Sequence, residues 1–342
     1  MNPPKVAVVI LNWNGKHFLE KFLPSVISHS NNINYSVWIA DNNSTDDSVN
    51  FLKNNFPQIN IIEFDKNYGF ALGYNKALEQ IDAQYFVLLN SDVEVTPNWI
   101  SPIIEFMDQN PQVAVVQPKI LSYNNKKMFE YAGAAGGFID TLGYPFCKGR
   151  ILNKLEEDNG QYNKIDNIFW ATGACFFIRK EEFLENKFDP DLFAHMEEID
   201  LCWRLKNKRK KIVYFPYVQV YHLGGGSLPN NSPFKLYLNY RNNLLVLYKN
   251  LPKNKTFTKI FFRMFFDGLS AIIYILRFEF KNFFAVLKAH IHFYKLLPKF
   301  KAKRKLQLKT NSFSHTEIYK KNIVFDFYFK KKSIFTVLNF QR

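Results

Sequence analysis

The chain has 342 residues, which is enough for one large domain or for a domain with an appendage. Aromatic residues make up 17% of it, including 36 Phe, so it can build a sizeable core and still leave apolar surface over. Its net charge of +15 is unevenly placed, because residues 1–234 hold 22 Lys and Arg against 26 Asp and Glu, whereas residues 235–342 hold 23 against 4. This excludes a uniformly basic chain and indicates two functional regions.

Cysteine content and the first residues bear on where the protein works. Cys147, Cys175 and Cys202 are odd in number and lack the spacing of a metal site. We interpret them as packing residues in a reduced, cytosolic compartment. The first twelve residues contain one lysine and an apolar run of about seven residues, which is too short for a signal peptide and typical of a strand.

The first half of the chain alternates apolar runs of strand length with segments of helical spacing, which predicts a mostly parallel sheet covered on both faces. The predicted strands are 5–11, 36–40, 60–64, 85–89 and 113–117, and the predicted helices are 16–28, 46–54, 70–80 and 99–109. The first strand is followed by Asn12-Trp13-Asn14-Gly15 and not by G-x-G-x-x-G, which argues against dinucleotide binding.

Further along, a polar stretch over 150–168 predicts a loop. A strand over 169–179, a helix over 199–207 and short strands over 212–215 and 218–222 follow it. Gly224-Gly225-Gly226, with Pro229 and Pro233 after it, predicts a mobile connector where the composition changes. Residues 313–342 remain unassigned.

Beyond the connector the chain is helical, aromatic and basic. Over 256–276, Lys259, Arg263 and Asp267 recur every four positions and form a polar stripe opposite an apolar face. A transmembrane helix does not normally carry three charges in its first half, whereas an amphipathic helix in the membrane interface does. We predict such helices over 256–276 and 277–297, and binding of anionic lipids by the basic run 299–305.

Two alternatives remain for this region. It could be a solvated helical face with a basic tail. It could also bind nucleic acid, but we do not expect this, because it lacks a groove-reading motif and has more Phe than phosphate binding needs.

Polar groups follow the ends of predicted strands, where ligands bind in open α/β sheets. Asp92 ends the run Asn90-Ser91-Asp92 after the fourth strand and could hold a divalent cation or only form a turn. Asp41 follows the second strand and could accept bonds from a base or ribose, or join the helix cap beside it. The segment from Asn67 to Gly73 opens a helix whose N-terminus would suit a diphosphate, although a simple turn explains it equally.

Two later groups could complete a site. Glu197, Glu198 and Asp200 crowd three carboxylates within four residues, which can raise a carboxyl pKa towards the range of a general base. The alternative is an acidic first turn favoured by the helix dipole. His222 ends a strand beside the glycine run and could bind a metal with Asp92, or it could be structural.

Five motifs in this order resemble glycosyltransferase family 2, and in particular its bacterial rhamnosyltransferase-like members with the GT-A fold. They are residues 6–14 (VAVVILNWN), 41–46 (DNNSTD), 67–71 (NYGFA), 89–92 (LNSD) and 197–201 (EEIDL). The match covers about residues 5–250, including Tyr237-Leu238-Asn239-Tyr240-Arg241-Asn242.

The resemblance implies an α/β GT-A (Rossmann-like) domain over 1–234, with a mostly parallel mixed sheet flanked by helices. Residues 235–342 would form a basic, aromatic-rich, membrane-associating helical region. Asp41 would contact the nucleotide base and ribose, and the 67–73 loop would lie near the ribose-diphosphate portion. The full set of implied donor-binding residues is Asn12, Asp41, Asn43, Asn67, Gly69, Gly73 and Asn90.

The resemblance also implies a metal site and a base. Asp92 matches the last position of the D-x-D-like motif, where Asn90 replaces the first acid, and His222 matches a late ligand, so both would bind Mg²⁺ or Mn²⁺. Glu198 aligns best with the catalytic base, with Glu197 and Asp200 as alternatives. Residues 170–174 resemble the segment that lines the acceptor side.

The implied activity is transfer of a sugar, with inversion, from a nucleotide-sugar donor to a hydroxyl of a lipid-linked saccharide in cell-surface polysaccharide synthesis. The subgroup suggests dTDP-rhamnose as donor. The cysteines and the amphipathic, basic C-terminal region add the expectation of a cytoplasmic, peripheral location on the inner face of the cell membrane, against anionic lipid. One alternative is a sugar-nucleotide pyrophosphorylase, which should carry a Gly/Arg-rich loop after the first strand. The other is a non-enzymatic membrane or nucleic-acid adaptor.

Overall fold

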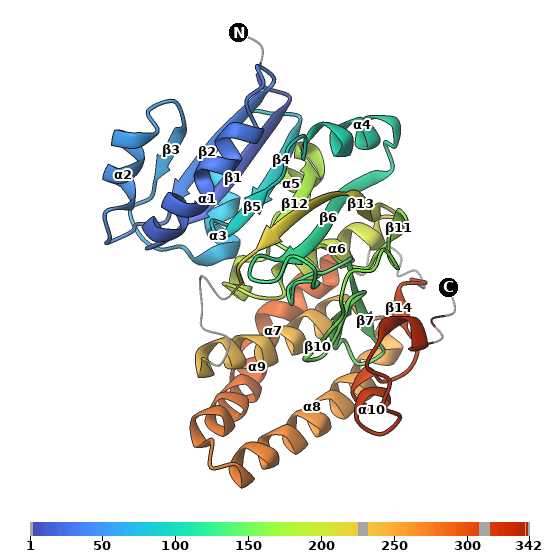
Figure 1. The fold of residues 1–342 in the computed structure, drawn as a ribbon. Coiled ribbons are helices and arrows are strands. Elements are labelled where there is room, and N and C mark those ends of the chain that lie inside the picture. Colours follow the sequence, from blue (N-terminus) through green and yellow to red (C-terminus); the bar gives the residue numbers. More distant parts are fainter. Residues whose placement is uncertain (1–2, 225–231, 308–314, 339, 341–342) are drawn as a thin grey trace.

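The computed structural model describes residues 3–224, 232–307, 315–338 and 340 (Figure 1). Its larger sheet has the strand order β11-β13-β6-β12-β4-β1-β2-β3, with β5 paired to β13. The strands are β1 Val6–Asn12, β2 Tyr35–Asp41, β3 Asn60–Glu63, β4 Tyr85–Leu89, β5 Val93–Val95, β6 Val113–Ser122, β11 Asp166–Asn167, β12 Cys175–Arg179 and β13 Lys211–His222.

The strand directions make this a mixed sheet. Parallel pairs join β1 to β2 and β4, β2 to β3, and β6 to β13, whereas β12 runs antiparallel to both β4 and β6. The carboxyl ends of β1, β2, β4 and β13 therefore meet at one edge of the sheet, which is where the predicted site residues lie.

Apolar side chains fill both faces of the sheet. Along β1, Ala7 and Val9 belong to one core cluster, and Val6, Val8 and Ile10 belong to the other. Burial on both faces explains why these strands read as continuous apolar runs in the sequence. The helices that cover the faces are α1 Lys16–His29, α2 Ser48–Asn55, α3 Gly69–Leu78, α4 Ser101–Gln109, α5 Lys180–Asn186 and α6 Glu197–Asn207.

The structure confirms the five strands and four helices predicted in the first half, and it corrects the sequence reading after them. The strand predicted over 169–179 is only Cys175–Arg179, and the two predicted over 212–215 and 218–222 are the single strand β13. The register of β13 against β6 shifts between Phe215 and Gln219, a stretch that contains Pro216, which has no amide hydrogen to donate.

The polar stretch predicted to be a loop contributes to a second, five-stranded sheet with the order β10-β9-β8-β7-β14. Its strand β14 comes from the unassigned C-terminal segment and pairs in parallel with β7, with Ile318 opposite Ile139. The strands are β7 Gly137–Asp140, β8 Pro145–Cys147, β9 Arg150–Ile151, β10 Lys154–Leu155 and β14 Ile318–Tyr319. Gly225, Gly226 and Pro229 of the predicted connector lie outside the described residues.

The C-terminal region is helical, as predicted. It contains α7 Pro233–Asn250, α8 Lys253–Leu276, α9 Phe280–Gln307, α10 Ile323–Tyr328 and the short η2 Phe335–Leu338. The α8–α9 hairpin extends away from the sheet, whereas α7 adds Leu244 and Leu247 to the same core cluster as β1 (Figure 1). The division at residue 234 stays a prediction.

Helix α8 is amphipathic as predicted, and its polar stripe faces the protein. Asp267 is fully buried and Arg263 is 5% exposed, and the two form an ion pair of 2.8 Å. On the opposite face Phe257, Phe261 and Phe265 are 83%, 59% and 55% exposed. The alternative of a solvated charged face is therefore wrong for α8. Within the described residues, no helix combines the length and apolar character needed to cross a bilayer.

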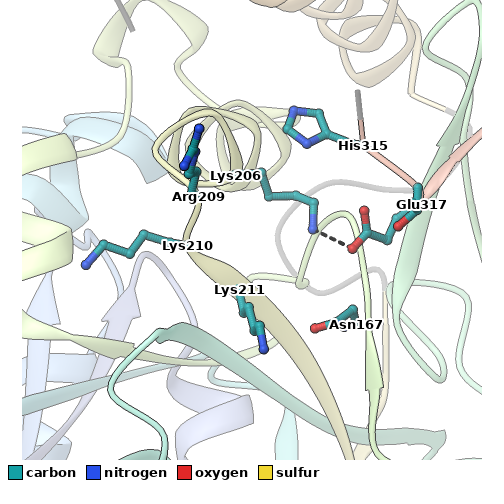
Figure 2. Close-up of a pocket in the computed structure, with 8 residues that line it drawn as sticks. Asn167, Lys206, Arg209, Lys210, Lys211, His315 and Glu317 are labelled. Atoms are coloured by element: carbon teal, nitrogen blue, oxygen red, sulfur yellow. Dashed lines mark hydrogen bonds and ion pairs between the residues drawn. The ribbon is translucent and has the colours of Figure 1, made fainter. Parts of the chain in front are cut away.

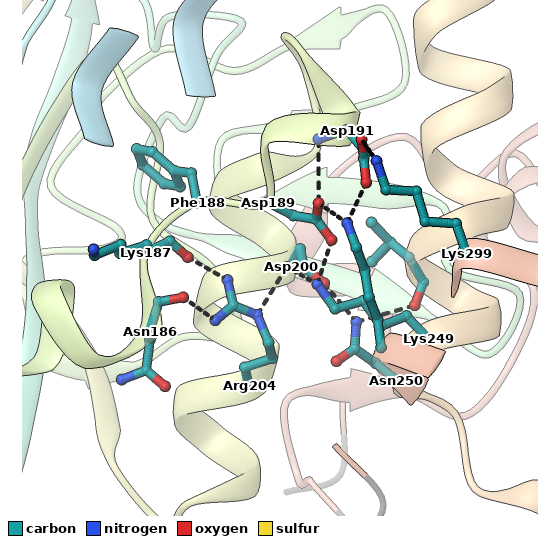
Figure 3. Close-up of polar contacts among 12 residues, drawn as sticks. Asn186, Lys187, Phe188, Asp189, Asp191, Asp200, Arg204, Lys249, Asn250 and Lys299 are labelled. Carbon is teal, nitrogen blue, oxygen red and sulfur yellow. Dashed lines mark hydrogen bonds and ion pairs between the residues drawn. The ribbon is translucent and has the colours of Figure 1, made fainter. Parts of the chain in front are cut away.

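The basic run 299–305 needs a correction, because part of it is used inside the protein. Lys299 pairs with Asp191 at 2.5 Å, and Lys303 pairs with both Asp189 and Asp191 (Figure 3). Arg304 donates to the carbonyls of Tyr248 and Leu251. Lys303 and Arg304 hold α9 against the domain, whereas the Lys299 side chain stays 59% exposed despite its ion pair.

Candidate active site

His222 and Asp92 meet at the carboxyl edge of the sheet. Strand β5 runs antiparallel to β13 and sets Val93 opposite His222, which brings the preceding Asp92 to the imidazole. His222 Nε2 lies 3.1 Å from Asp92 Oδ1 and 3.4 Å from Asn90 Nδ2. Both His222 and Asp92 are buried. The structure thus brings these three predicted residues together.

Glu130 completes this group and was missed by sequence reasoning. Its Oε2 lies 3.3 Å from His222 Nδ1, so the imidazole sits between two buried carboxylates. Burial lowers the pKa of His222, but Asp92 and Glu130 outweigh it and raise that pKa to about 10. No motif surrounds Glu130; only the fold brings it to His222.

The side-chain atoms at this edge can be compared with the ligands that a divalent cation needs. Asp92 Oδ1 and His222 Nε2 are 3.1 Å apart, about the separation of neighbouring ligands that each lie ~2.1 Å from one ion. Among the described residues, no group of three or more His, Cys, Asp or Glu side chains is arranged to hold a metal. The pair therefore fits Mg²⁺ or Mn²⁺ only if the ion displaces the proton of His222 and if phosphate oxygens and water supply the remaining ligands.

Asp41 is buried at the end of β2, directly opposite Asn12 in the register of β1 and β2. Its carboxylate accepts bonds from Asn12 Nδ2 at 2.9 Å and from Ser44 N and Oγ at 2.8 and 2.7 Å. A carboxylate offers about four acceptor positions, so these bonds leave room for one further donor.

Asn12 presents an unused acceptor beside Asp41. Its Oδ1 is buried and has no hydrogen-bond partner among the described residues. A side chain at Gly15 would place its Cβ 2.5 Å from this oxygen, so the glycine keeps the space open. A buried amide oxygen without a partner is costly, and an N–H or O–H of a ligand would satisfy it.

Asn42, which sequence reasoning also missed, holds the predicted 67–73 loop. Its Nδ2 donates to Asn67 Oδ1 at 3.0 Å and to the Gly69 carbonyl at 3.1 Å, and its Oδ1 accepts from Tyr68 N at 2.9 Å. The neighbouring Asn43 is exposed and adopts a left-handed backbone with φ +61°. Asn42 was visible as part of the 41–46 motif, but only the fold shows what it contacts.

The start of α3 differs from the prediction that it offers free amides to a diphosphate. The amides of Phe70 and Ala71 donate to the Phe193 carbonyl at 2.9 and 3.0 Å. Gly69 has φ +71° and a Cβ there would lie 2.5 Å from the Phe193 ring, so only glycine fits. Gly73 lies against Leu11 of β1, which favours a packing role.

The backbone segment before β12 lies between Glu198 and Asn90 and places both residues at the same edge of the sheet. The Gly173 amide donates to Glu198 Oε1 at 3.1 Å, and the Asn90 amide donates to the carbonyl of the next residue, Ala174, at 3.1 Å. Burial raises the pKa of the Glu198 carboxyl, although the bond from Gly173 opposes this. Glu198 is only half-buried, unlike Glu197 and Asp200 beside it.

Glu197 is in a different state from its neighbour. It is 2% exposed, and its Oε2 has no hydrogen-bond partner within the described part of the chain. Burial, followed by the charge of Glu198, raises its pKa well above the ordinary value. Both causes favour the protonated form of the Glu197 carboxyl.

Asp200 belongs to a buried ion network, which corrects its place among the candidate bases. It accepts from Arg204 Nε at 2.8 Å, Lys249 Nζ at 2.9 Å and Asn250 Nδ2 at 2.8 Å (Figure 3). Burial alone would raise its pKa, but Lys249 and Arg204 outweigh burial and lower it. A carboxylate held ionised in this way is a poor proton acceptor, so Asp200 is structural.

The loop before α6 is clamped by α7. Asn242 donates to the carbonyls of Leu192, Ala194 and His195 at 2.9, 2.9 and 2.8 Å. Phe193, His195 and Met196 all have positive φ (67°, 67° and 73°), which is rare for such side chains and needs support from the surroundings. The 237–242 motif therefore positions the loop before α6, a role that its sequence alone does not reveal.

One cavity of about 250 Å³ lies at the opposite edge, where β13 begins at Lys211 and α6 ends (Figure 2). Its lining includes Lys206, which is paired with Glu317 at 2.9 Å and donates to the Ile168 carbonyl. None of the predicted site residues lines this cavity.

Comparisons with known proteins agree with the resemblance. The family model described as "Glycosyl transferase family 2" matches residues 7–185. The N-acetylglucosaminyl-diphospho-decaprenol L-rhamnosyltransferase of Mycobacterium tuberculosis is 25% identical over 236 residues, covering 64% of this chain and 75% of that protein. Rhamnosyltransferase WbbL of Escherichia coli is 20% identical, covering 64% of this chain and 83% of that one.

Solved structures agree on the fold. GalNAc-T7 with UDP, GalNAc and Mn²⁺ superposes with a TM-score of 0.56 at 17% identity, over 72% of this chain and 48% of that one. S. aureus TarS 1–349 superposes with a TM-score of 0.50 at 14% identity, over 76% and 72%. With the family match spanning more than half of its length, this chain is a GT-A fold member of glycosyl transferase family 2, similar to bacterial rhamnosyltransferases.

Proposed function

We propose that this protein is an inverting, metal-dependent glycosyltransferase that transfers a sugar from a nucleotide-sugar donor to a hydroxyl of a lipid-linked saccharide. One observation carries the proposal. The Asp92–His222 pair and Glu198 lie at one edge of the sheet, linked through Asn90–Ala174 and Gly173–Glu198 hydrogen bonds. A site that binds a leaving diphosphate and a base that activates a hydroxyl are the two parts that such a transfer needs.

Asp92 and His222 would hold Mg²⁺ or Mn²⁺, which would neutralise charge on the departing nucleoside diphosphate. Glu130 would keep the His222 ring oriented through its contact with Nδ1. Because the protein offers so few ligands, the ion should bind weakly to the protein alone and well when the nucleotide is present.

Glu198 would act as the base. Its Oε1 is fixed by the Gly173 amide, which leaves Oε2 to accept the proton of the acceptor hydroxyl. The hydroxyl oxygen would then attack the anomeric carbon directly, on the face opposite the diphosphate, and the configuration inverts. Such base catalysis typically contributes roughly 10²–10⁴-fold to the rate.

The donor would bind along the ends of β1 and β2. Asn12 Oδ1 supplies an unused acceptor, and Asp41 has room for one further donor. The M. tuberculosis relative is named as an L-rhamnosyltransferase that acts on a diphospho-decaprenol saccharide. We therefore infer dTDP-rhamnose as the first donor to test, and a saccharide on a lipid diphosphate as the acceptor.

The proposal includes a peripheral location on the inner face of the cell membrane. The apolar face of α8 points away from the protein, and residues 235–342 carry 23 Lys and Arg against 4 Asp and Glu. An exposed apolar helix face within a cationic region suits an anionic bilayer surface.

The test is a screen of nucleotide sugars, dTDP-rhamnose first, with a lipid-diphosphate saccharide as acceptor. We expect release of nucleoside diphosphate and a glycosylated lipid of inverted configuration, both dependent on Mg²⁺ or Mn²⁺. Formation of a nucleotide sugar from sugar phosphate and nucleoside triphosphate would instead identify a pyrophosphorylase.

A further inference from the structure

A cavity of about 470 Å³ lies between the start of α7 and the turn that joins α8 to α9. This volume falls within the ~300–1,000 Å³ range of small-ligand pockets. Lys235 and Asn239 line it from α7, and Arg277 and Asn282 line it from the hairpin. It lies outside the Asp92–His222 and Glu198 groups described above.

The lining is rich in hydrogen-bond donors that come from two separate parts of the chain. Lys235 and Arg277 contribute two cations, and Asn239 and Asn282 contribute amides. The one acid in the lining, Glu279, accepts a bond from Asn282 Nδ2 at 2.8 Å. Two cations from facing elements, with amides beside them, suit a phosphorylated group.

Lys235 connects this cavity to the candidate active site. Burial lowers the pKa of His195 to about 4, and the charge of Lys235 contributes to this lowering. The charge of Glu130, the residue that contacts His222, also acts on Lys235 and opposes the lowering of its pKa by burial. The next residue back, Phe234, packs edge-on against Phe193 with ring centroids 6.4 Å apart. One side of the cavity therefore borders the site.

The other side borders the exposed apolar surface of the hairpin. Arg277 is flanked by Leu276 and Phe278, which are 73% and 81% exposed. The turn thus sets a cation that faces the cavity beside apolar side chains that face outward. A ligand that spans this cavity would have a sugar at the site, phosphate in the middle and an apolar chain at the hairpin.

We propose that this cavity binds the diphosphate of the lipid-linked acceptor, with the acceptor sugar directed to Glu198 and the lipid chain along the α8–α9 turn. This inference rests on the proposed function and assigns a place to its acceptor. The same chemistry could come from the donor's nucleoside diphosphate, but the apolar border at Leu276 and Phe278 favours the lipid.

The test measures binding of farnesyl diphosphate, a water-soluble lipid diphosphate, and of dTDP and UDP to the full-length protein by calorimetry. We expect Arg277→Gln to weaken farnesyl diphosphate binding about tenfold or more, as loss of a charged hydrogen bond does, with nucleotide binding within twofold of wild type. Lys281→Gln is the matched control, because Lys281 is an exposed cation on α9 outside the cavity lining. It should leave both affinities unchanged.

Three outcomes would overturn the inference: wild-type farnesyl diphosphate binding in Arg277→Gln, equal weakening in Lys281→Gln, or an equal loss of nucleotide affinity, which would assign the cavity to the donor. Glycosyl transfer by wild type with an unchanged acceptor KM in Arg277→Gln would reject the cavity alone. Arg277-dependent lipid binding without any transfer would reject the proposed function alone.

Discussion

At the scale of the residue, the side chains of Glu197, Glu198 and Asp200 differ in their pKa shifts and in their burial, and their contacts explain the differences. Lys249 and Arg204 keep the Asp200 carboxylate ionised. Glu197 is buried, and its Oε2 has no hydrogen-bond partner among the described residues. Glu198 is half-buried and accepts one hydrogen bond from the Gly173 amide. Of the three, only Glu198 combines a raised pKa with partial exposure.

Changing Glu198 to Gln should lower kcat by roughly 10²–10⁴-fold, because the amide cannot accept the acceptor's proton. Donor affinity should change little, and Glu185→Gln, an exposed acid on α5, should keep wild-type turnover. Steady-state kinetics and nucleotide-sugar binding measure both. Since the Glu198 pKa is raised, the wild-type rate should fall as pH falls through a value above 4.5. Wild-type kcat in the Gln variant would exclude Glu198 as the base.

Glu197 predicts a stability effect whose sign follows from its raised pKa. The folded state holds this proton more tightly than the unfolded state, so the stabilisation is present below the unfolded pKa and is lost as pH rises through the folded one. Glu197→Gln should therefore gain stability relative to wild type as pH rises above the unfolded pKa of the carboxyl. Thermal unfolding at a series of pH values measures this. Parallel pH profiles for the two proteins would contradict it.

At the scale of the element, the Asp200 network joins α6 to α7 and, through Asp189, to α9 (Figure 3). Asp200→Asn should lower the free energy of unfolding by about 3–5 kcal/mol, because Lys249 and Arg204 lose a buried partner. Asp82→Asn, which breaks the exposed pair with Lys180, should cost less than ~1 kcal/mol. Urea unfolding of both variants gives the comparison; equal losses would show that the buried network adds nothing.

Elements can be predicted from the sequence where a local apolar pattern specifies them. They cannot be predicted where contacts between residues distant in the sequence specify them. Strands that are buried on both faces, such as β1 and β4, can be predicted directly from their apolar runs. Strand β14 has two residues and exists because it pairs with β7, so no local pattern marks it. In the site, strand-end positions predicted Asp41 and Asp92, but Glu130 and Asn242 act through contacts across the fold.

At the scale of the whole molecule, the orientation of α8 is what a sequence pattern could not decide. Its four-residue charge spacing predicts an amphipathic helix but not which face meets the protein. The fold buries Arg263 and Asp267 with Asn243 and His290 as partners and leaves the phenylalanines outside. Exposed aromatic side chains on one face indicate a surface that is covered in use.

Replacing Phe257, Phe261 and Phe265 with Ser should reduce binding to anionic phospholipid vesicles about tenfold or more, because each ring loses burial in the interface. Stability should be unchanged, since these side chains are largely exposed. Ile33→Ser, at an exposed position before β2, is the control and should bind as wild type. Co-sedimentation measures this. Equal pelleting of the triple variant and wild type would remove the membrane role of α8.

The central claim is that one edge of this sheet performs metal-dependent sugar transfer through Asp92 and Glu198. The most direct measurement compares wild type with the Asp92→Ala, Glu198→Ala double variant in transfer from dTDP-rhamnose and other nucleotide sugars to a lipid-diphosphate saccharide, with and without chelator. We expect turnover by wild type that chelator abolishes and Mg²⁺ or Mn²⁺ restores, and a folded double variant with no turnover. Undiminished transfer by the double variant would contradict this assignment of the site, and absence of transfer by wild type would favour an adaptor.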